Sequence, residues 1–391
     1  MKTIKILTIL ITFFTIIPGC SRDRTEIIYN RKYTDEIKAA RKDIIFFMST
    51  NYIPGGSFAV ARDGEIIYSE GVGIASKDLN VRVNRETKFR IGEVTELFTG
   101  LIYLKMADEG ILHPDSTVRH YLPDIPDSSY KIPLKSLLDH TSGIREPYSG
   151  EEESGGPKVP IRQGINNYIN DRLNNPPGMF EIPSMFNYNL LGAIMEKTTG
   201  KSYDTILKEY LTDTLNLSNT LVDNPVITIK GRTDFYDHSL IANVVNAAFR
   251  DMRFSAPSEG LLSNAEDLVK LGNAVLYSDF LSDSMKETIF KPNTLLNNRT
   301  SNSAHGWLLL SDKSGRKIYG KSGNVPGGGA AILIYPNENL VVAGTTNLPP
   351  LSEEIPVFAL ADHFLSDNPL IEVIPPESLK NNEKSGSEPE K

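Results

Sequence analysis

The sequence predicts a mixed α/β fold of the α+β type, with strand patterns near both ends of the chain and a mainly helical middle. Two hairpin patterns and the helical periodicity between them are the observations that predict it. The hairpins comprise residues 57–61 with 65–69, and residues 331–335 with 340–344. The first hairpin turns at Asp63-Gly64, a dipeptide that favours tight hairpin turns. At 391 residues and 40% hydrophobic composition, the chain is long enough to build a sizeable core.

The N-terminal segment has the pattern of a secretion signal. Lys2 and Lys5 precede an apolar run, residues 6–17, which is too short to be a comfortable membrane span. The run ends next to Cys20, the only cysteine, in the order Ile-Pro-Gly-Cys that resembles a bacterial lipobox. We therefore expect residues 1–19 to be a lipoprotein-type signal peptide and Cys20 to be lipidated, which would anchor the protein at a membrane. The alternative is a plain secretory signal, or a short anchor, whose cysteine is incidental.

The next elements follow from composition and helical periodicity. Polar residues 20–33 are expected to form a tether, and 34–370 a single folded domain. A first helix is expected over 35–51, with one apolar face formed by Ile37, Ala40, Ile44, Ile45 and Met48. Further helices are expected from Val94 to near Gly110, over 188–198 and over 203–211, and a surface loop over 148–160. Residues 371–391 are polar and charged, and we expect a disordered tail.

Charge and composition exclude several classes of function. The net charge of −8 is spread along the chain, which favours solubility and gives no support to nucleic-acid binding. The six histidines show no metal-ligand spacing, so neither a metal nor another cofactor is expected.

Four motifs resemble those of one enzyme superfamily. They are Phe-Arg-Ile-Gly at 89–92, Leu-Leu-Asp-His-Thr-Ser-Gly-Ile at 137–144, Asn-Leu-Leu-Gly at 189–192, and Gly-Leu-Leu-Ser-Asn-Ala-Glu-Asp-Leu at 260–268. Together they resemble the serine β-lactamase and penicillin-binding-protein superfamily, in the branch of class C β-lactamases, DD-peptidases and related esterases. The resemblance covers roughly 53–365. It implies that the first and last strands share one antiparallel sheet flanked by helices, with a mainly helical region inserted between them.

The resemblance also locates the positions where catalytic side chains are expected. In the family the first motif supplies a nucleophilic serine and a lysine, and this chain has Glu93 and Glu96 there. The second motif usually supplies a tyrosine and an asparagine. Here the positions are Pro183, Ser184 and Met185, and neither the proline nor the methionine can replace them as hydrogen-bonding groups. The sequence therefore predicts no catalytic residue at these five positions.

The third motif is retained as Lys321-Ser322-Gly323, followed by Asn324. In relatives the lysine attracts a substrate carboxylate, the hydroxyl hydrogen-bonds it, and the strand backbone contributes to the oxyanion hole. The resemblance thus implies a ligand-binding role for these four residues, whereas the alternative is a Lys-Ser-Gly that only packs the strand. We expect Lys321 to pair with Glu93 and to fill the former acyl pocket; alternatively, both glutamates are solvated residues at its rim.

Two classes of function follow. The first is a membrane-anchored lipoprotein of the bacterial cell envelope, on its periplasmic or extracellular face, that binds without catalysis. Its partner would be a peptidoglycan stem peptide or another envelope protein. The second is an active hydrolase of esterase, peptidase or β-lactamase type that recruits Ser322, Ser184 or another hydroxyl as nucleophile. Covalent labelling by a penicillin or fluorophosphonate probe separates the two.

Overall fold

The computed structural model describes residues 27–125, 131–148, 151, 161–240, 243–351 and 354–366. The expected signal peptide, Cys20, most of the 148–160 loop and the C-terminal tail lie outside these residues. No helix in the described part of the chain is long and apolar enough to cross a lipid bilayer.

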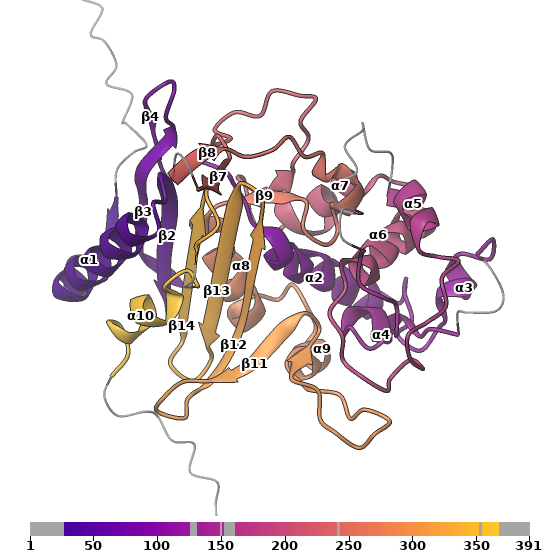
Figure 1. The fold of residues 1–391 in the computed structure, drawn as a ribbon. Coiled ribbons are helices and arrows are strands. Elements are labelled where there is room, and N and C mark those ends of the chain that lie inside the picture. Colours follow the sequence, from indigo (N-terminus) through magenta and orange to yellow (C-terminus); the bar gives the residue numbers. More distant parts are fainter. Residues whose placement is uncertain are drawn as a thin grey trace, which may run out of the picture.

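A nine-stranded antiparallel sheet forms the centre of the molecule (Figure 1). Its strands follow the order β1-β3-β2-β14-β13-β12-β11-β10, and β4 pairs with β3 outside this path. They are β1 (Ile28–Tyr29), β2 (Gly55–Arg62), β3 (Glu65–Ser76), β4 (Val81–Arg82), β10 (Ser303–Ala304), β11 (Trp307–Ser311), β12 (Lys317–Val325), β13 (Gly328–Tyr335) and β14 (Leu340–Thr346). Strand β14 pairs with β2, Gly344 opposite Phe58, so the first and last hairpins share one sheet as expected.

Strand β1 corrects the boundary predicted for the tether. Ile28 and Tyr29 pair with Ser69 and Tyr68 of β3, and the turn η1 (Arg31–Tyr33) leads directly into the first helix. The sequence did not predict this strand because two residues are too few to show an alternating pattern, and the residues around them are polar.

Helices cover both faces of the sheet, which explains why β2, β13 and β14 are buried at nearly every position. On one face, α1 (Thr34–Thr50) and α10 (Val357–Asp362) share a hydrophobic cluster with the strands. On the other face the cluster includes α2 (Thr95–Asp108) and α8 (Ala265–Tyr277). Figure 1 shows α8 behind the strands and α2 between the sheet and the helical region.

The buried face of α1 differs from the prediction at one position. Ile37, Ala40, Ile44 and Met48 are buried as expected, but Ile45 is 55% exposed and Phe47 is buried instead. A helix turns about 100° per residue, so position 45 lies about 100° from position 44, whereas position 47 lies only about 60° from it. The burial of Phe47 is therefore consistent with ideal helix geometry.

The inserted region consists mainly of short helices around the long central helices α2 and α6. The helical elements are α3 (Val118–Tyr121), α4 (Leu134–Leu138), α5 (Ile161–Gly164), η3 (Ile165–Asn167), α6 (Met185–Thr199), α7 (Tyr203–Leu207), the π-turn η4 (Lys208–Thr212), η5 (Met252–Ser255) and α9 (Asp283–Ile289). Two small sheets complete the region: β5 (Phe89–Arg90), β9 (Leu261–Ser263) and β6 (Leu221–Val222), and the hairpin of β7 (Tyr236–Ser239) and β8 (Asn243–Asn246).

The ends of α6 have clear local causes. Ser184 caps its N-terminus by accepting a hydrogen bond from the Phe186 N–H, so the helix begins three residues before the predicted start at Tyr188. Gly200 ends it in the left-handed conformation, with φ of +69°, that glycine adopts without strain.

Candidate functional site

The site forms where the turn η2 (Gly92–Val94) and the start of α2 lie against β12. Two glycines allow this close approach. A Cβ at Gly323 would come within 2.4 Å of the Glu93 amide nitrogen, and one at Gly92, whose φ is +51°, within 2.9 Å of the Asn324 nitrogen. Residues with a side chain would separate the two backbones. The contact places the N-terminal end of α2, with Glu93 and Glu96, beside Lys321.

Glu96, and not Glu93, is the hydrogen-bonded partner of Lys321. The Lys321 Nζ lies 2.5 Å from Glu96 Oε2, so the predicted Lys321–Glu93 pair is wrong. The His140 Nε2 lies 3.1 Å from the same oxygen, and only 3% of the Glu96 side chain is exposed. Burial favours the neutral carboxyl, but Lys321 and His140 outweigh it and lower the pKa of Glu96. Glu93 is one helical turn away and points toward the backbone of β12 instead.

A hydrogen-bonded chain orients the imidazole of His140. Its Nδ1 accepts from the Asn187 Nδ2 at 3.1 Å and from the Ser184 N–H at 3.3 Å. The Ser142 hydroxyl donates to Asn187 Oδ1 at 2.5 Å, which leaves the amide NH₂ of Asn187 facing His140. Because Nδ1 accepts, the ring proton lies on Nε2, which donates to Glu96. The chain thus connects Ser142, Asn187, His140, Glu96 and Lys321.

Glu93 contacts the strand after the Lys-Ser-Gly motif. Its Oε2 accepts a hydrogen bond from the Asn324 backbone N–H at 2.9 Å and lies 2.8 Å from the position a Gly323 Cβ would take. Burial, reinforced by the charge of Glu96, raises the pKa of Glu93, although the backbone N–H groups of Glu93 and Asn324 and the charge of Lys321 oppose the shift. Glu93 is thus partly buried and bonded to the backbone, which excludes a fully solvated rim residue.

The remaining residues of the third motif point elsewhere. Lys321 pairs with Ile332, which packs in the cluster of α2 and α8, whereas Ser322 pairs with Ala331, which packs in the cluster of α1 and α10. Successive side chains of a strand alternate, so Ser322 faces away from Glu96. Asn324 contributes its backbone N–H, while its side chain lies against Gly329.

The second-motif positions have structural roles. Ser184 is buried, and its hydroxyl donates to the Arg145 carbonyl at 2.7 Å and accepts from the Phe186 N–H as the cap of α6. Pro183 is exposed before the helix, and Met185 is its first, buried residue. The structure therefore brings only the backbone N–H of Ser184 to the site.

Other hydroxyl groups near α2 also form hydrogen bonds within the protein. Tyr188 is fully buried and donates to the Leu138 carbonyl at 2.8 Å. Thr99 donates to the Pro257 carbonyl at 2.6 Å, and Thr95 accepts from the Leu261 N–H at 3.4 Å. Both threonines are buried.

Sequence reasoning did not predict a role for His140 and Asn187. His140 belongs to a recognised signature, and its φ of +55° is uncommon for a residue other than glycine. The available signal was the coincidence of a His-containing family motif with an acidic residue at position 96. The described residues contain no cluster of three or more His, Cys, Asp or Glu side chains with metal-binding geometry.

A sheet built from the first and last hairpins, with a helical region inserted between them, defines the β-lactamase/transpeptidase-like fold. The chain belongs to the β-lactamase family, whose profile, described as Beta-lactamase, matches residues 40–362.

Sequence and structural relatives agree with this assignment. Protein flp of Staphylococcus aureus (strain MW2) is 26% identical over 330 residues, which cover 81% of this chain but only 63% of the relative. The chain therefore spans less than two thirds of that relative's length. The octameric penicillin-binding protein homologue from Pyrococcus abyssi has a TM-score of 0.72 at 22% identity, covering 84% of this chain and 77% of that one. A class C β-lactamase has a TM-score of 0.72 at 18% identity, covering 87% and 99%. At these identities the two structures show the fold alone.

Proposed function

We propose that this protein is a non-catalytic binding protein of the bacterial cell envelope, built on the β-lactamase fold and anchored through a lipidated Cys20. The observation that carries the proposal is the hydrogen bond between the Glu93 carboxylate and the Asn324 backbone N–H. In active relatives the strand after the third motif contributes to the oxyanion hole, which stabilises the negative oxygen of the reacting acyl group. In this chain the carboxylate of Glu93 accepts the hydrogen bond from the corresponding backbone N–H, that of Asn324.

The proton-transfer groups support the same proposal. Lys321 is paired with Glu96 at 2.5 Å, so its ammonium is held by a charged partner. Removing the nucleophile alone from a concerted hydrolytic site costs about a million-fold in turnover. An attack by the Glu93 carboxylate would produce an anhydride. The neighbouring carboxylate, Glu96, already accepts from Lys321 and His140, so it is a poor base for resolving that anhydride.

The charges of the site bear on its ligand. In relatives the motif lysine attracts a substrate carboxylate, but here a ligand carboxylate would have to compete with Glu96 for Lys321. Glu93 adds a second acidic group at the strand edge. A peptidoglycan stem peptide or an envelope protein would therefore be recognised through uncharged or hydrogen-bond-donating groups more than through a terminal carboxylate.

A covalent probe tests the proposal. The full-length protein is incubated with a fluorescent penicillin and with a fluorophosphonate, and an active class C β-lactamase serves as positive control. We expect no labelled band. Labelling at any serine would overturn the non-catalytic proposal. Cosedimentation with purified peptidoglycan then separates the two ligand classes, since only a stem-peptide binder is pelleted in proportion to the sacculi.

Ser322 is the residue that favours the alternative, an active hydrolase. It is partly exposed, and its hydroxyl has no hydrogen-bond partner among the described residues. If it were a nucleophile, the probe would label wild-type protein and Glu93→Ala but not Ser322→Ala. Glu93→Ala is the matched control because it changes the site without removing a hydroxyl.

A further inference from the structure

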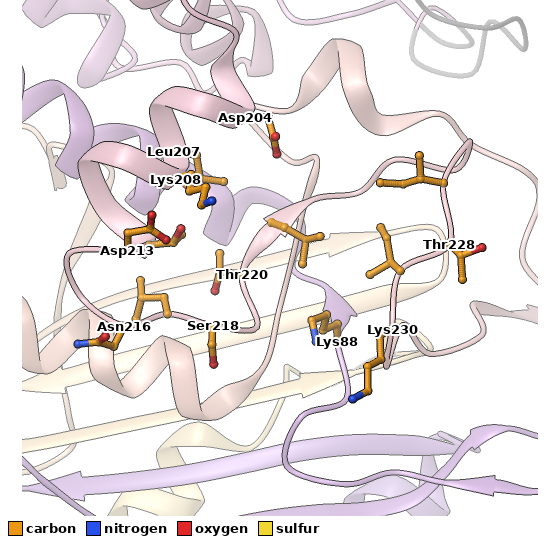
Figure 2. A pocket seen from close by; sticks show the side chains of 15 residues that line it. Lys88, Asp204, Leu207, Lys208, Asp213, Asn216, Ser218, Thr220, Thr228 and Lys230 are labelled. Atoms are coloured by element: carbon orange, nitrogen blue, oxygen red, sulfur yellow. The ribbon is translucent and has the colours of Figure 1, made fainter.

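A cavity separate from the glutamate site lies among the helix α7, the π-turn after it and two loops of the inserted region (Figure 2). Its volume is about 870 Å³, within the size range of small-molecule sites. Its lining residues include Lys88, Lys208 and Lys230, and neither Glu93, Glu96 nor Lys321 is among them.

Lys88 is the most informative residue of this cavity. It is partly buried, and its ammonium donates to two neutral acceptors, the Asn219 Oδ1 at 3.0 Å and the Glu86 carbonyl at 3.2 Å. It forms no ion pair within the described part of the chain. Burial lowers its pKa, the carboxylates of Glu86 and Asp267 oppose this, and the charge of Lys230 adds to the lowering. An anion in the cavity would stabilise this ammonium.

The neighbouring cations are also unpaired. Lys208 and Lys230 are exposed, and in the described ranges neither has a hydrogen-bond or ion-pair partner. Lys230 lies beside Lys88 in Figure 2, and a Cβ on the adjacent Gly231 would be 3.6 Å from the Lys88 Nζ. The positive charges of Lys88 and Lys230 repel one another, and an anion bound between them would offset this repulsion.

The other lining groups restrict the ligand. Ser218 and Thr228 are exposed at the cavity and offer hydroxyl donors. Asp204 and Asp213 line it from the side of α7 and the π-turn, opposite Lys230 in Figure 2. These carboxylates would repel a second anionic group, which disfavours a polyphosphate or a nucleic acid.

We propose that this cavity binds a small molecule with a single phosphate group, held by Lys88 and Lys230. A phosphate has more acceptor oxygens than a carboxylate, which matches two ammonium groups and two hydroxyls. Lysine binds phosphate as a compact point charge without requiring a planar partner. The rest of the ligand faces Asp204 and Asp213 and is neutral or cationic.

Calorimetry on the full-length protein tests the proposal with two probes. Glycerol 3-phosphate represents a soluble phosphomonoester, and glycerophosphoglycerol represents the diester of a phospholipid headgroup. Saturable binding of either one supports the site, and the tighter of the two identifies the source of the phosphate. The absence of saturable binding for both would overturn the proposal.

Matched variants locate the binding. Lys230→Ala and Lys208→Ala remove exposed side chains, so we expect both proteins to fold. Lys230→Ala should weaken phosphate binding at least about tenfold, because it removes a charge-assisted hydrogen bond, and Lys208→Ala, on the side of the aspartates, should weaken it less. Lys38→Ala removes an exposed lysine from α1, on the far face of the sheet, and should leave the affinity unchanged. If Lys38→Ala lost as much phosphate affinity as Lys230→Ala, the effect would be due to net charge alone, and the proposal would be contradicted.

Discussion

At the scale of single residues, the site depends on a changed pairing of charges. The family resemblance places Glu96 at the position where a catalytic lysine is expected, and Glu96 binds Lys321. Glu96 therefore compensates a cation that would otherwise be unpaired in a largely buried environment. Glu93 has a separate role, because it bonds to the strand backbone.

Removing one partner of this pair should be costly. Glu96→Ala leaves Lys321 and His140 without their common acceptor, and breaking a buried pair in this way costs about 3–5 kcal/mol. We expect the free energy of unfolding, measured with urea, to fall by that order. The free energy of unfolding should fall clearly less in the double variant Glu96→Leu/Lys321→Met, because neither member of the ion pair is left unpaired. A double variant as unstable as the single one would contradict this account of the pair.

The contributions of Glu96 and Glu93 to the stability of the fold should change with pH in opposite directions. The folded-state pKa of Glu96 is lowered, so its stabilising contribution is present above its unfolded value and lost as the pH falls through the folded pKa. The folded-state pKa of Glu93 is raised, so ionising Glu93 costs stability once the pH exceeds its unfolded value near 4.5.

The variant Glu93→Gln isolates the second effect. It keeps an oxygen for the Asn324 N–H and removes the charge, so it should be more stable than wild type at pH 7. The gain should shrink as the pH falls and vanish below about 4.5, the ordinary value for the unfolded chain. Melting temperatures of both proteins across this range provide the measurement. A constant difference at all pH values would mean that the charge of Glu93 is not the cause.

At the scale of elements, the contact between η2 and β12 positions both glutamates. Gly323→Ala would place a Cβ 2.4 Å from the Glu93 nitrogen, and the crowding should cost about 1–3 kcal/mol. Gly164→Ala is the matched control, because its Cβ would meet no atom closer than 3.6 Å and alanine favours the helix α5. Thermal unfolding should show a clear drop for the first variant and none for the second. Equal melting temperatures would exclude a tight η2–β12 contact.

The elements also show what the sequence could predict. The paired hairpins, α1, α2 and α6 were predictable because each repeats a period over many residues or has an explicit end signal such as Gly200. The two-residue strand β1 was not, because it lacks a pattern. The partner of Lys321 was missed for another reason. Glu93 and Glu96 are one helical turn apart, and only the close contact at Gly323 shows which of them faces the strand backbone.

At the scale of the whole molecule, the proposed anchor is a lipidated Cys20. Replacing Cys20 with Ala removes the proposed acceptor for lipidation while leaving the described body of the protein untouched. Wild-type protein should sediment with membranes, and Cys20→Ala should appear in the soluble envelope or secreted fraction, since stable anchoring needs more than one acyl chain. Immunoblotting of fractions measures this. Membrane retention of Cys20→Ala would contradict lipidation as the anchor.

The pairing of β14 with β2 also has a consequence for how the chain reaches its native state. Phe58 and Gly344 lie opposite one another although they come from opposite ends of the domain. During synthesis, β2 emerges long before its partner β14, so one of its edges stays unpaired until the last hairpin has been made. Closing so long a loop is slow. The protein therefore passes through a stage that is prone to strand-mediated aggregation, and a C-terminal truncation before β14 would prolong that stage.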